Sequence, residues 1–282
     1  MTDTYSGEIE AGQRFEFGKN WETFLSEIDD SRIRIAEDAT KTMLGSASLD
    51  GKTFLDVGSG SGLFSLVALR LGASSVHSFD YDPHSVECTK ALKLQQCPSK
   101  ARWTIERGSV LDAGYLESLG QFDFVYSWGV LHHTGNLWQA LENVAPLVKQ
   151  DGLLFLSIYN YQPFLSAYWR LVKRIYNHLP KVGRLAMTVA LFSFYGGGLF
   201  VADLARGRSP FHRWAGHGRR GMSMYVDIQD WVGGYPFEVA SPEEIFRFYR
   251  DRGFALRELK TCGGKHGCNQ FVFERAPTGS RG

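Results

Sequence analysis

The sequence predicts an α/β fold built on a doubly wound sheet, and three observations support this. From position 53 onward, apolar runs of strand length alternate with helical segments of about 10 to 15 residues. A glycine-rich turn, Gly58 to Gly62, directly follows the first of these runs. Polar residues end several later runs, and open parallel sheets bind ligands at that end of their strands. We therefore expect a ligand site along one edge of a parallel sheet.

The first strand and its turn have the sequence TFLDVGSGSG at positions 53–62, and a helix is predicted from Leu63 to Leu71. Glycines are needed where the backbone turns tightly and passes close to a ligand. A dinucleotide fingerprint, G-x-G-x-x-G, would require its last glycine at position 63, which is leucine. The form here is D-x-G-x-G-x-G, with Asp56 two residues ahead of the first glycine. That carboxylate would repel a pyrophosphate and would suit a positively charged ligand.

The second strand, Val76 to Asp80, ends in an acid 24 residues after Asp56. An acid at this strand end can accept two hydrogen bonds from the hydroxyls of a ribose, and Tyr81 could lie against an adenine ring. An aspartate at such a place can instead cap the following helix. We assign the cap to Asp82, which directly precedes a proline, and ribose binding to Asp80.

Three further strands are predicted at 103–106, 122–127 and 152–159, with a helix over 136–148 between the last two. Polar or aromatic residues stand at or just after their carboxyl ends: Ser109, Ser127, Trp128, Tyr159 and Asn160. We expect these residues at the same edge of the sheet as the two acids.

This pattern resembles the class I S-adenosylmethionine (SAM) dependent methyltransferases, whose motif I has the form found at positions 56–62. The resemblance covers about residues 50 to 160 and returns at the C-terminus, where 242–252 predict a helix and 254–261 and 269–275 two strands. It implies a Rossmann-like, doubly wound seven-stranded sheet, parallel except for one reversed C-terminal strand.

The resemblance also implies SAM as the cofactor. The three glycines of the turn would approach its methionine part, with Asp56 near the amino group. Ser109 and Val110 would flank the adenine. The predicted cofactor-binding residues are Asp56, Gly58, Gly60, Gly62, Asp80, Tyr81, Ser109, Val110, Ser127 and Trp128.

Four segments are predicted along the chain. Residues 1–49 form an N-terminal helical cap, in which the amphipathic stretch from Arg14 to Ile28 closes over the SAM site. Residues 50–160 form the SAM-binding Rossmann-like core. Residues 161–238 form a basic and apolar helical insertion after the fifth strand, and 239–282 complete the core sheet.

The insertion has an unusual charge. Between positions 161 and 221 there are ten Lys or Arg residues and one acid, Asp203, so this stretch carries about +9. The whole chain carries +1, which leaves about −8 for the remainder. Such an asymmetry indicates an anionic partner.

The insertion is also apolar in a patterned way. Residues 164–175 predict a helix with a broad apolar face and with Arg170, Lys173 and Arg174 on its other side. The following stretch, 185–202, has no charged residue and is at the lower length limit for a membrane span. A lid over an apolar substrate pocket is the favoured interpretation. A surface that dips into anionic lipid through 164–205, a membrane span and a homo-oligomer interface are the alternatives.

The chemistry follows from the cofactor. A sulfonium methyl group leaves by in-line displacement, so alignment and exclusion of water supply much of the rate. A hydroxyl acceptor also needs a base, and histidine titrates in the required range. The predicted catalytic residues are His132, His133 and Tyr159, and at most one of the two histidines is expected to reach the acceptor. Local packing is the alternative role for the histidine pair.

The predicted substrate-binding residues lie after the fifth strand and in the insertion. They are Asn160, Arg170, Lys173, Arg174 and Tyr225, and His212 and His217 could supply a base from the lid. Cys262, His266 and Cys268 invite a metal interpretation, but the glycines between them are typical of a turn between antiparallel strands. We therefore expect no metal.

Three functions were weighed. The first is a methyltransferase for a small or lipid-linked, anionic or amphiphilic acceptor, most simply at oxygen. The second is an RNA methyltransferase using the basic insertion, but the Asn/Asp-Pro-Pro-aromatic motif of many base-methylating enzymes is replaced by Ser-Trp-Gly-Val at positions 127–130. The third is a SAM-binding module without catalysis. We choose the first and expect no nucleic-acid partner.

The four cysteines lack framework spacing, and the first apolar run is too late for a signal peptide. We therefore expect a cytoplasmic protein, and we include contact with the inner face of a membrane in this expectation.

Overall fold

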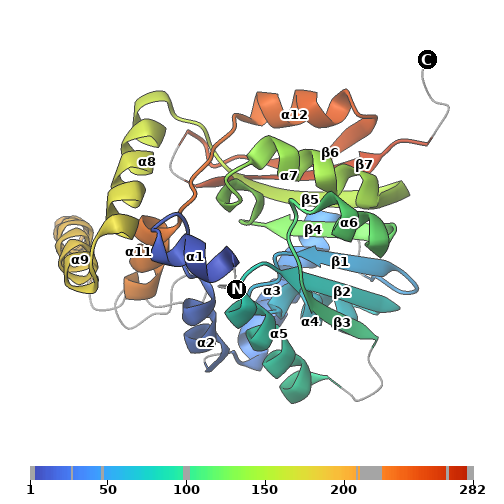
Figure 1. Ribbon diagram of the computed structural model, residues 1–282, viewed down its shortest axis with the longest axis horizontal. Helices are drawn as coiled ribbons and strands as arrows, with labels where there is room; N and C mark the ends of the chain where they lie inside the picture. Colours follow the sequence, from blue (N-terminus) through green and yellow to red (C-terminus); the bar gives the residue numbers. More distant parts are fainter. Residues whose placement is uncertain are drawn as a thin grey trace.

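A computed structural model of the chain describes all residues except 1–3, 27, 46–47, 98–101, 208, 210–223, 265–266 and 278–282. Its centre is a seven-stranded sheet with the strand order β3-β2-β1-β4-β5-β7-β6 (Figure 1). The strands are β1 (Thr53–Val57), β2 (Ser75–Asp80), β3 (Trp103–Arg107), β4 (Phe122–Trp128), β5 (Val148–Tyr159), β6 (Phe254–Lys260) and β7 (Cys268–Arg275). The predicted Rossmann-like fold class is confirmed.

The pairing of the strands follows the prediction as well. β1 pairs in parallel with β2 and β4, and β4 pairs in parallel with β5. β7 runs antiparallel to both β5 and β6, so one C-terminal strand is reversed. The order changes direction at β1, which sends the chain first to one side of β1 and then to the other. Doubly wound sheets bind their ligands at this switch point.

Helices cover both faces of the sheet. α3 (Asp30–Leu44), α4 (Leu63–Arg70) and α5 (Pro83–Gln96) precede or connect the first strands, and α6 (Ala113–Leu119), α7 (Leu137–Val144) and α12 (Pro242–Arg250) accompany the later ones. Adjacent residues of β1 point to opposite faces, so Phe54 packs in one buried cluster and Leu55 in the other. Both faces of the sheet are therefore covered by apolar packing.

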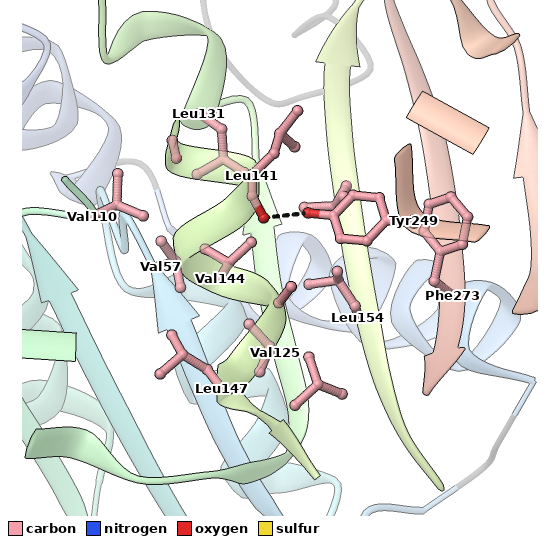
Figure 2. Close-up of a cluster of buried hydrophobic side chains, with 14 of the residues drawn as sticks. Val57, Val110, Val125, Leu131, Leu141, Val144, Leu147, Leu154, Tyr249 and Phe273 are labelled. Carbon is pink, nitrogen blue, oxygen red and sulfur yellow. Dashed lines mark hydrogen bonds between the residues drawn. The ribbon is translucent and has the colours of Figure 1, made fainter. Parts of the chain in front are cut away.

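Figure 2 shows the cluster between the sheet, α7 and α12. Val125 and Leu154 come from β4 and β5, and Leu141 and Val144 come from α7. Tyr249 of α12 is fully buried, and its hydroxyl donates a hydrogen bond to the backbone oxygen of Leu141 at 3.1 Å. This bond satisfies the one polar atom that the tyrosine brings into the cluster.

The helix predicted over 136–148 is shorter in the structure. α7 ends at Val144 and a 3₁₀ turn covers Ala145–Leu147, after which β5 begins at Val148. Pro146 stands in that turn, and a proline has no backbone N–H with which to continue α-helical hydrogen bonding.

The remaining helices gather at one side of the sheet (Figure 1). They are α1 (Thr4–Glu10), α2 (Gly18–Ser26), α8 (Pro163–His178), α9 (Lys181–Ala205) and α11 (Met224–Gly233). A third apolar cluster joins them through Phe15, Trp169, Tyr176, Val232 and Phe237. It packs the N-terminal segment against α8 and α11, next to the carboxyl end of β5.

α8 is turned differently from the expectation. Lys173 is fully buried, whereas the sequence pattern placed it with Arg170 and Arg174 on the outer side of the helix. Trp169 and Tyr176 are the side chains that anchor α8 to the third cluster, and Lys173 lies one turn from each on the same face. The lysine is therefore carried inward by its aromatic neighbours.

Candidate active site

One large cavity, of about 1140 Å³, lies beyond the carboxyl ends of β1, β2 and β4. Its lining runs from the glycine turn to α8 and α11, and the N-terminal segment closes part of its wall. Pockets for a single drug-sized ligand have volumes of about 300–1,000 Å³. This cavity is therefore large enough for two ligands that meet in it.

Asp56 lies in the cavity wall at the end of β1. Its side chain is buried, and Oδ2 accepts a hydrogen bond from Ser65 Oγ at 2.5 Å. Ser65 Oγ lies 2.7 Å from Ser78 Oγ, which also accepts from the Trp103 indole N–H at 2.7 Å. Burial raises the pKa of Asp56 to about 7, and the hydrogen bond from Ser65 opposes that rise. A cation brought beside Asp56 would shift it toward the ionised form.

The glycines of the turn all have left-handed backbone, with φ of 79° at Gly58, 54° at Gly60 and 80° at Gly62. A Cβ at Gly58 would lie 2.4 Å from a methyl carbon of Val130, and one at Gly60 would lie 3.0 Å from the Trp21 ring. Glycine is thus required by the backbone angle and by close packing within the protein. Gly58 and Gly60 also line the cavity, whereas Gly62 does not.

Asp80 joins the glycine turn to β2. Its Oδ2 accepts a hydrogen bond from the Gly60 backbone N–H at 2.9 Å, and its Oδ1 accepts one from the Asp82 N–H at 2.9 Å. Burial raises the pKa of Asp80 to about 6, although these backbone bonds favour the charged form. Each carboxylate oxygen can accept a further bond, and Asp80 lines the cavity.

The residues after Asp80 hold the N-terminal segment. Asp82 caps α5, accepting from the His84 N–H at 2.9 Å as predicted, and its second oxygen accepts from the Gly18 N–H at 2.7 Å. Tyr81 lines the cavity, and the guanidinium carbon of Arg14 lies 4.8 Å from its ring centre. The first residues of α5 therefore fix where the N-terminal segment crosses the cavity.

Three of the other four predicted cofactor-binding residues line the cavity: Ser109, Val110 and Trp128. Ser127 does not. Its side chain is fully buried, and Oγ donates to the Val57 backbone oxygen at 3.2 Å. Side chains alternate between the two faces of a strand. Ser127 therefore points to one face, where it contacts the end of β1, and Trp128 points to the other and reaches the cavity.

The two histidines differ in position and in tautomer. His133 lines the cavity, and its Nδ1 lies 2.6 Å from the Pro236 backbone oxygen, which can only accept. This contact assigns the ring proton to Nδ1 and leaves Nε2 with its lone pair. His132 is fully buried outside the cavity lining, and its Nδ1 accepts from the Tyr159 N–H at 3.3 Å. Of the pair, His133 alone is placed to meet a ligand.

Both imidazoles are neutral at physiological pH. Burial, together with the charges of Lys173 and Arg14, lowers the pKa of His133 to about 3, although the hydrogen bond to Pro236 acts to raise it. Burial also holds the pKa of His132 well below its usual range. Burial lowers the pKa of Lys173 to about 7, and nearby Asp230 opposes this.

Aromatic side chains from the N-terminal segment, β5, α8 and α11 line part of the cavity. Tyr159 stands among them, with its ring centre 5.5 Å from those of His133 and Trp231. The aromatic wall consists of Phe15, Phe17, Tyr159, Trp169 and Trp231, all in the cavity lining. The polar residues His133, Arg14 and Asp230 also line the cavity.

Sequence reasoning assigned no individual site role to Arg14 or Asp230. Arg14 donates to the His133 backbone oxygen at 3.0 Å and pairs with Glu8 at 2.6 Å. The amphipathic N-terminal stretch was recognised as a cover, but its register against the histidines depends on tertiary packing. α11 gave no signal for Asp230 beyond its turn-rich surroundings.

Four of the five predicted substrate-binding residues do not line the cavity. Asn160 Oδ1 accepts from the Asn269 side chain at 3.0 Å at the sheet edge. Arg170 donates to the Phe237 backbone oxygen at 3.3 Å, and Arg174 is exposed on the outer side of α8. Lys173 donates to the Trp231 backbone oxygen behind the aromatic wall. None of these four residues lines the cavity.

The other candidates from the insertion lie beyond what the structure describes. Tyr225 belongs to α11, but its side chain is outside the described part. His212, His217 and His266 are outside the described residues. Gly263 and Gly264 form a turn between β6 and β7, as the alternative to a metal site required. Within the described part of the chain, no three His, Cys, Asp or Glu residues group as metal ligands would.

Comparison with known proteins gives a family and several relatives. The family described as methyltransferase domain matches residues 28–215. A ubiquinone biosynthesis O-methyltransferase of Xanthomonas campestris pv. campestris is 35% identical over 116 residues, which are 41% of this chain and 46% of that protein. A ribosomal protein L11 methyltransferase of Anoxybacillus flavithermus is 30% identical over 122 residues, 38% of either chain. The match thus spans less than half the length of these curated relatives.

Solved structures resemble the whole fold. A structure from Listeria monocytogenes, assigned to the S-adenosylmethionine dependent methyltransferases, has a TM-score of 0.50 at 11% identity. The likeness covers 86% of this chain and 99% of that one. At this identity it shows a shared fold alone.

Proposed function

This chain belongs to the methyltransferase domain family, matched over residues 28–215, and from that premise we propose that it methylates an oxygen of a small or lipid-linked, amphiphilic acceptor. SAM is the methyl donor. The observation that carries the choice of oxygen is His133, whose ring stands in the cavity wall with its proton fixed on the far nitrogen.

The residues at the glycine turn fit SAM. Two carboxylates, the buried Asp56 and the half-buried Asp80, face a cavity at the switch point of the sheet. Burial raises their pKa values to about 7 and about 6, and a bound cation would lower both. SAM carries an ammonium and a sulfonium, and it supplies an electrophilic methyl group. Asp56 would hold the amino group and Asp80 the ribose, with Ser109 and Val110 beside the adenine.

His133 supports a proton-accepting role. A neutral imidazole whose Nδ1 donates to a carbonyl presents Nε2 as a hydrogen-bond acceptor. The Pro236 carbonyl and the stack against Phe17, 4.9 Å between ring centres, keep the ring in one orientation. A hydroxyl that hydrogen-bonds to Nε2 would be both positioned and relieved of its proton.

The lowered pKa of His133 keeps the ring neutral, so Nε2 can accept a hydrogen bond from a hydroxyl. Because such a ring is a weak base, the acceptor we propose is an acidic hydroxyl, such as a phenol or enol, which gives up its proton more readily than an alcohol does. Alkyl alcohols would require a stronger base. The proton affinity of His133 would also rise if Lys173, which lowers it, were neutral.

The aromatic wall supports an acceptor with a flat, apolar body. The five aromatic side chains of this wall line the cavity. Aromatic rings pack favourably against such a wall in edge-to-face or offset geometry. A relative over 41% of this chain is a ubiquinone biosynthesis O-methyltransferase, and an aromatic hydroxyl in an apolar molecule has the same chemistry.

The test is product analysis with methyl-labelled SAM and a matched set of acceptors. All acceptors in the set share one apolar aromatic body. They differ in the group that this body carries, which is a phenol hydroxyl, an aliphatic alcohol, an amine or a carboxylate. We expect label on the phenol oxygen, located by mass spectrometry and NMR. Methylation confined to the amine or to carbon would overturn the proposal, and so would turnover of the alcohol equal to that of the phenol.

A further inference from the structure

α8 presents an apolar stripe away from the protein. Phe164, Tyr168, Leu171 and Ile175 are all exposed, and Phe164 is 90% exposed. Steps of four, three and four residues place these side chains on one face of a helix. The helix is already anchored through its opposite face, so the stripe is not used in folding the described part of the chain.

α9 adds further exposed apolar side chains. Val182, Leu185 and Val189 share one face of the helix, whereas Phe194 lies on a different face, and Val182 and Phe194 are 78% and 75% exposed. No residue from 185 to 202 is charged. Both helices lie at the same extremity of the molecule (Figure 1). We call the eight exposed apolar side chains of the two helices the α8–α9 surface.

The charges around this surface have one sign. Arg170, Arg174, Lys181 and Arg206 are exposed on these two helices or directly after them. The single acid between positions 161 and 207 is Asp203, which is buried. Exposed apolar patches of this kind mark interaction sites, and here the complementary partner must be both apolar and anionic.

We propose that the α8–α9 surface docks on an anionic lipid bilayer. The apolar side chains enter the boundary between headgroups and acyl chains, and the arginines and lysine contact the anionic headgroups. No helix among the described residues is long and apolar enough to cross a membrane. Two adjoining helices with exposed apolar side chains and flanking basic residues instead suit a position in the plane of the interface.

A second copy of the chain fits this surface less well. In a two-fold symmetric contact the same patch meets itself, so Arg170, Arg174 and Lys181 would face their own like charges. Juxtaposed like charges oppose association. An anionic leaflet pairs with all of them at once.

The surface is linked to the active site by α8 itself. Trp169 lines the cavity, and its ring centre lies 5.5 Å from that of Tyr168 in the exposed stripe. If the acceptor is lipid-linked, as the proposed function allows, docking would bring its membrane reservoir to the cavity. Docking itself does not depend on the proposed function.

The experiment is flotation of the purified full chain with vesicles of phosphatidylcholine, alone or mixed with phosphatidylglycerol. We expect binding to the mixed vesicles that weakens as salt is raised. Phe164→Ser with Leu171→Ser should lower the partition coefficient at least tenfold. Arg174→Gln with Lys181→Gln should lower it about 25-fold, since each basic residue contributes about fivefold at such a surface.

Matched controls separate the surface from general properties of the chain. Leu94→Ser removes an apolar residue that is 86% exposed on α5. Lys41→Gln with Lys90→Gln removes two charges on α3 and α5. Both controls should bind vesicles like the wild type. Circular dichroism spectra and melting temperatures should match for all variants.

Three results would overturn the docking proposal. They are absence of binding to either vesicle, equal losses in the control variants, and a monomer–dimer change caused by Phe164→Ser with Leu171→Ser without any vesicle binding. Methylation of a water-soluble phenol without vesicles is measured in parallel. It reports on the proposed function alone, because none of these substitutions touches the cavity lining.

Discussion

The carboxylate of Asp80 accepts a hydrogen bond from the backbone N–H of Gly60 at 2.9 Å. The acid at the end of β2 therefore fixes the glycine turn after β1, and the two halves of the cofactor site are one unit. Asp80 is also tied to the Asp82 N–H at 2.9 Å, and Asp82 holds the N-terminal segment through Gly18. One chain of contacts thus runs from the glycine turn to the cover of the cavity.

Asp80→Ala should weaken SAM binding by about 1–3 kcal/mol, the usual effect of leaving polar partners unmatched. The loss combines the ribose contact with the slackened Gly60 backbone. Calorimetric titration with SAM, and separately with NAD, measures this directly, and we expect micromolar SAM binding and no NAD binding in the wild type. Asp251→Ala on the exposed end of α12 is the control. Unaltered SAM affinity in Asp80→Ala would mean that the ribose is held elsewhere.

The stability of the ligand-free protein should fall between about pH 4 and pH 7 because of Asp56. In an unfolded chain this carboxyl ionises near pH 3.9, whereas burial raises its pKa to about 7 in the folded protein. Between these values the unfolded state binds fewer protons, so the free energy of unfolding decreases as pH rises.

Urea unfolding from pH 4.5 to pH 7.5 checks this prediction. Asp56→Asn, which cannot ionise, should show a flatter pH dependence than the wild type. Parallel curves would show that Asp56 does not hold its proton in the folded state. Saturating SAM should also flatten the wild-type curve, since a cation beside Asp56 lowers its pKa.

Much of the fold was predictable because short stretches of sequence determine it. The alternation of apolar runs and helices predicted the sheet, and the D-x-G-x-G-x-G sequence predicted the turn whose φ angles only glycine adopts readily. Asp82 was predicted as a cap from its place before a proline, and it caps α5. These features depend on a few neighbouring residues, so a sequence can show them.

The part of the cavity proposed for the acceptor was not predictable, because it depends on contacts between residues that are far apart in the sequence. Whether Lys173 faces inward depends on Trp169 and Tyr176 packing against segments far away in sequence. The basic residues of the insertion suggested an acceptor site, but their charge says nothing about which side of α8 is covered. Arg14 reaches His133 across 119 positions of chain, and no local pattern encodes that distance.

Gly58→Ala should destabilise the protein more than Gly253→Ala. Both glycines have φ near 80°, and alanine costs about 1–2 kcal/mol in that conformation. At Gly253 the new Cβ meets nothing within 4 Å, whereas at Gly58 it would lie 2.4 Å from Val130. Overpacking adds about 1–3 kcal/mol. Urea unfolding of both variants gives the difference, and Val130→Ala should recover part of it in the Gly58→Ala background. Equal losses at the two sites would exclude the clash with Val130.

His133→Asn should lower kcat for a phenolic acceptor about 10²-fold, the low end of the usual range for loss of a general base, because its lowered pKa makes His133 a weak base. SAM affinity should stay within about twofold, since His133 stands on the acceptor side of the cavity. His132→Asn is the paired control, because His132 is buried outside the cavity lining. Its effect should be on stability. Similar kcat losses in both variants, tracking their stability, would reduce the histidines to a packing role.

Lys173→Met should change the pH dependence of stability on the alkaline side. The Lys173 side chain is fully buried, and burial lowers its pKa to about 7. An unfolded lysine keeps its proton to about pH 10.4. Between these values the unfolded state binds more protons than the folded state, so wild-type stability rises with pH. The contribution approaches about 1.4 kcal/mol per pH unit at most.

Lys173→Met keeps the length of the side chain and removes the titration. Guanidinium unfolding at pH 6.5, 8.0 and 9.5 measures the free energy of unfolding of both proteins. We expect this free energy to rise with pH in the wild type relative to the variant. Arg174→Gln, one residue away on the exposed side, removes one positive charge and should leave the slope unchanged. If the wild type and Lys173→Met rise in parallel, the lysine keeps its proton in the folded protein. Asp230, the one carboxylate that raises the lysine pKa, would then be its counter-ion.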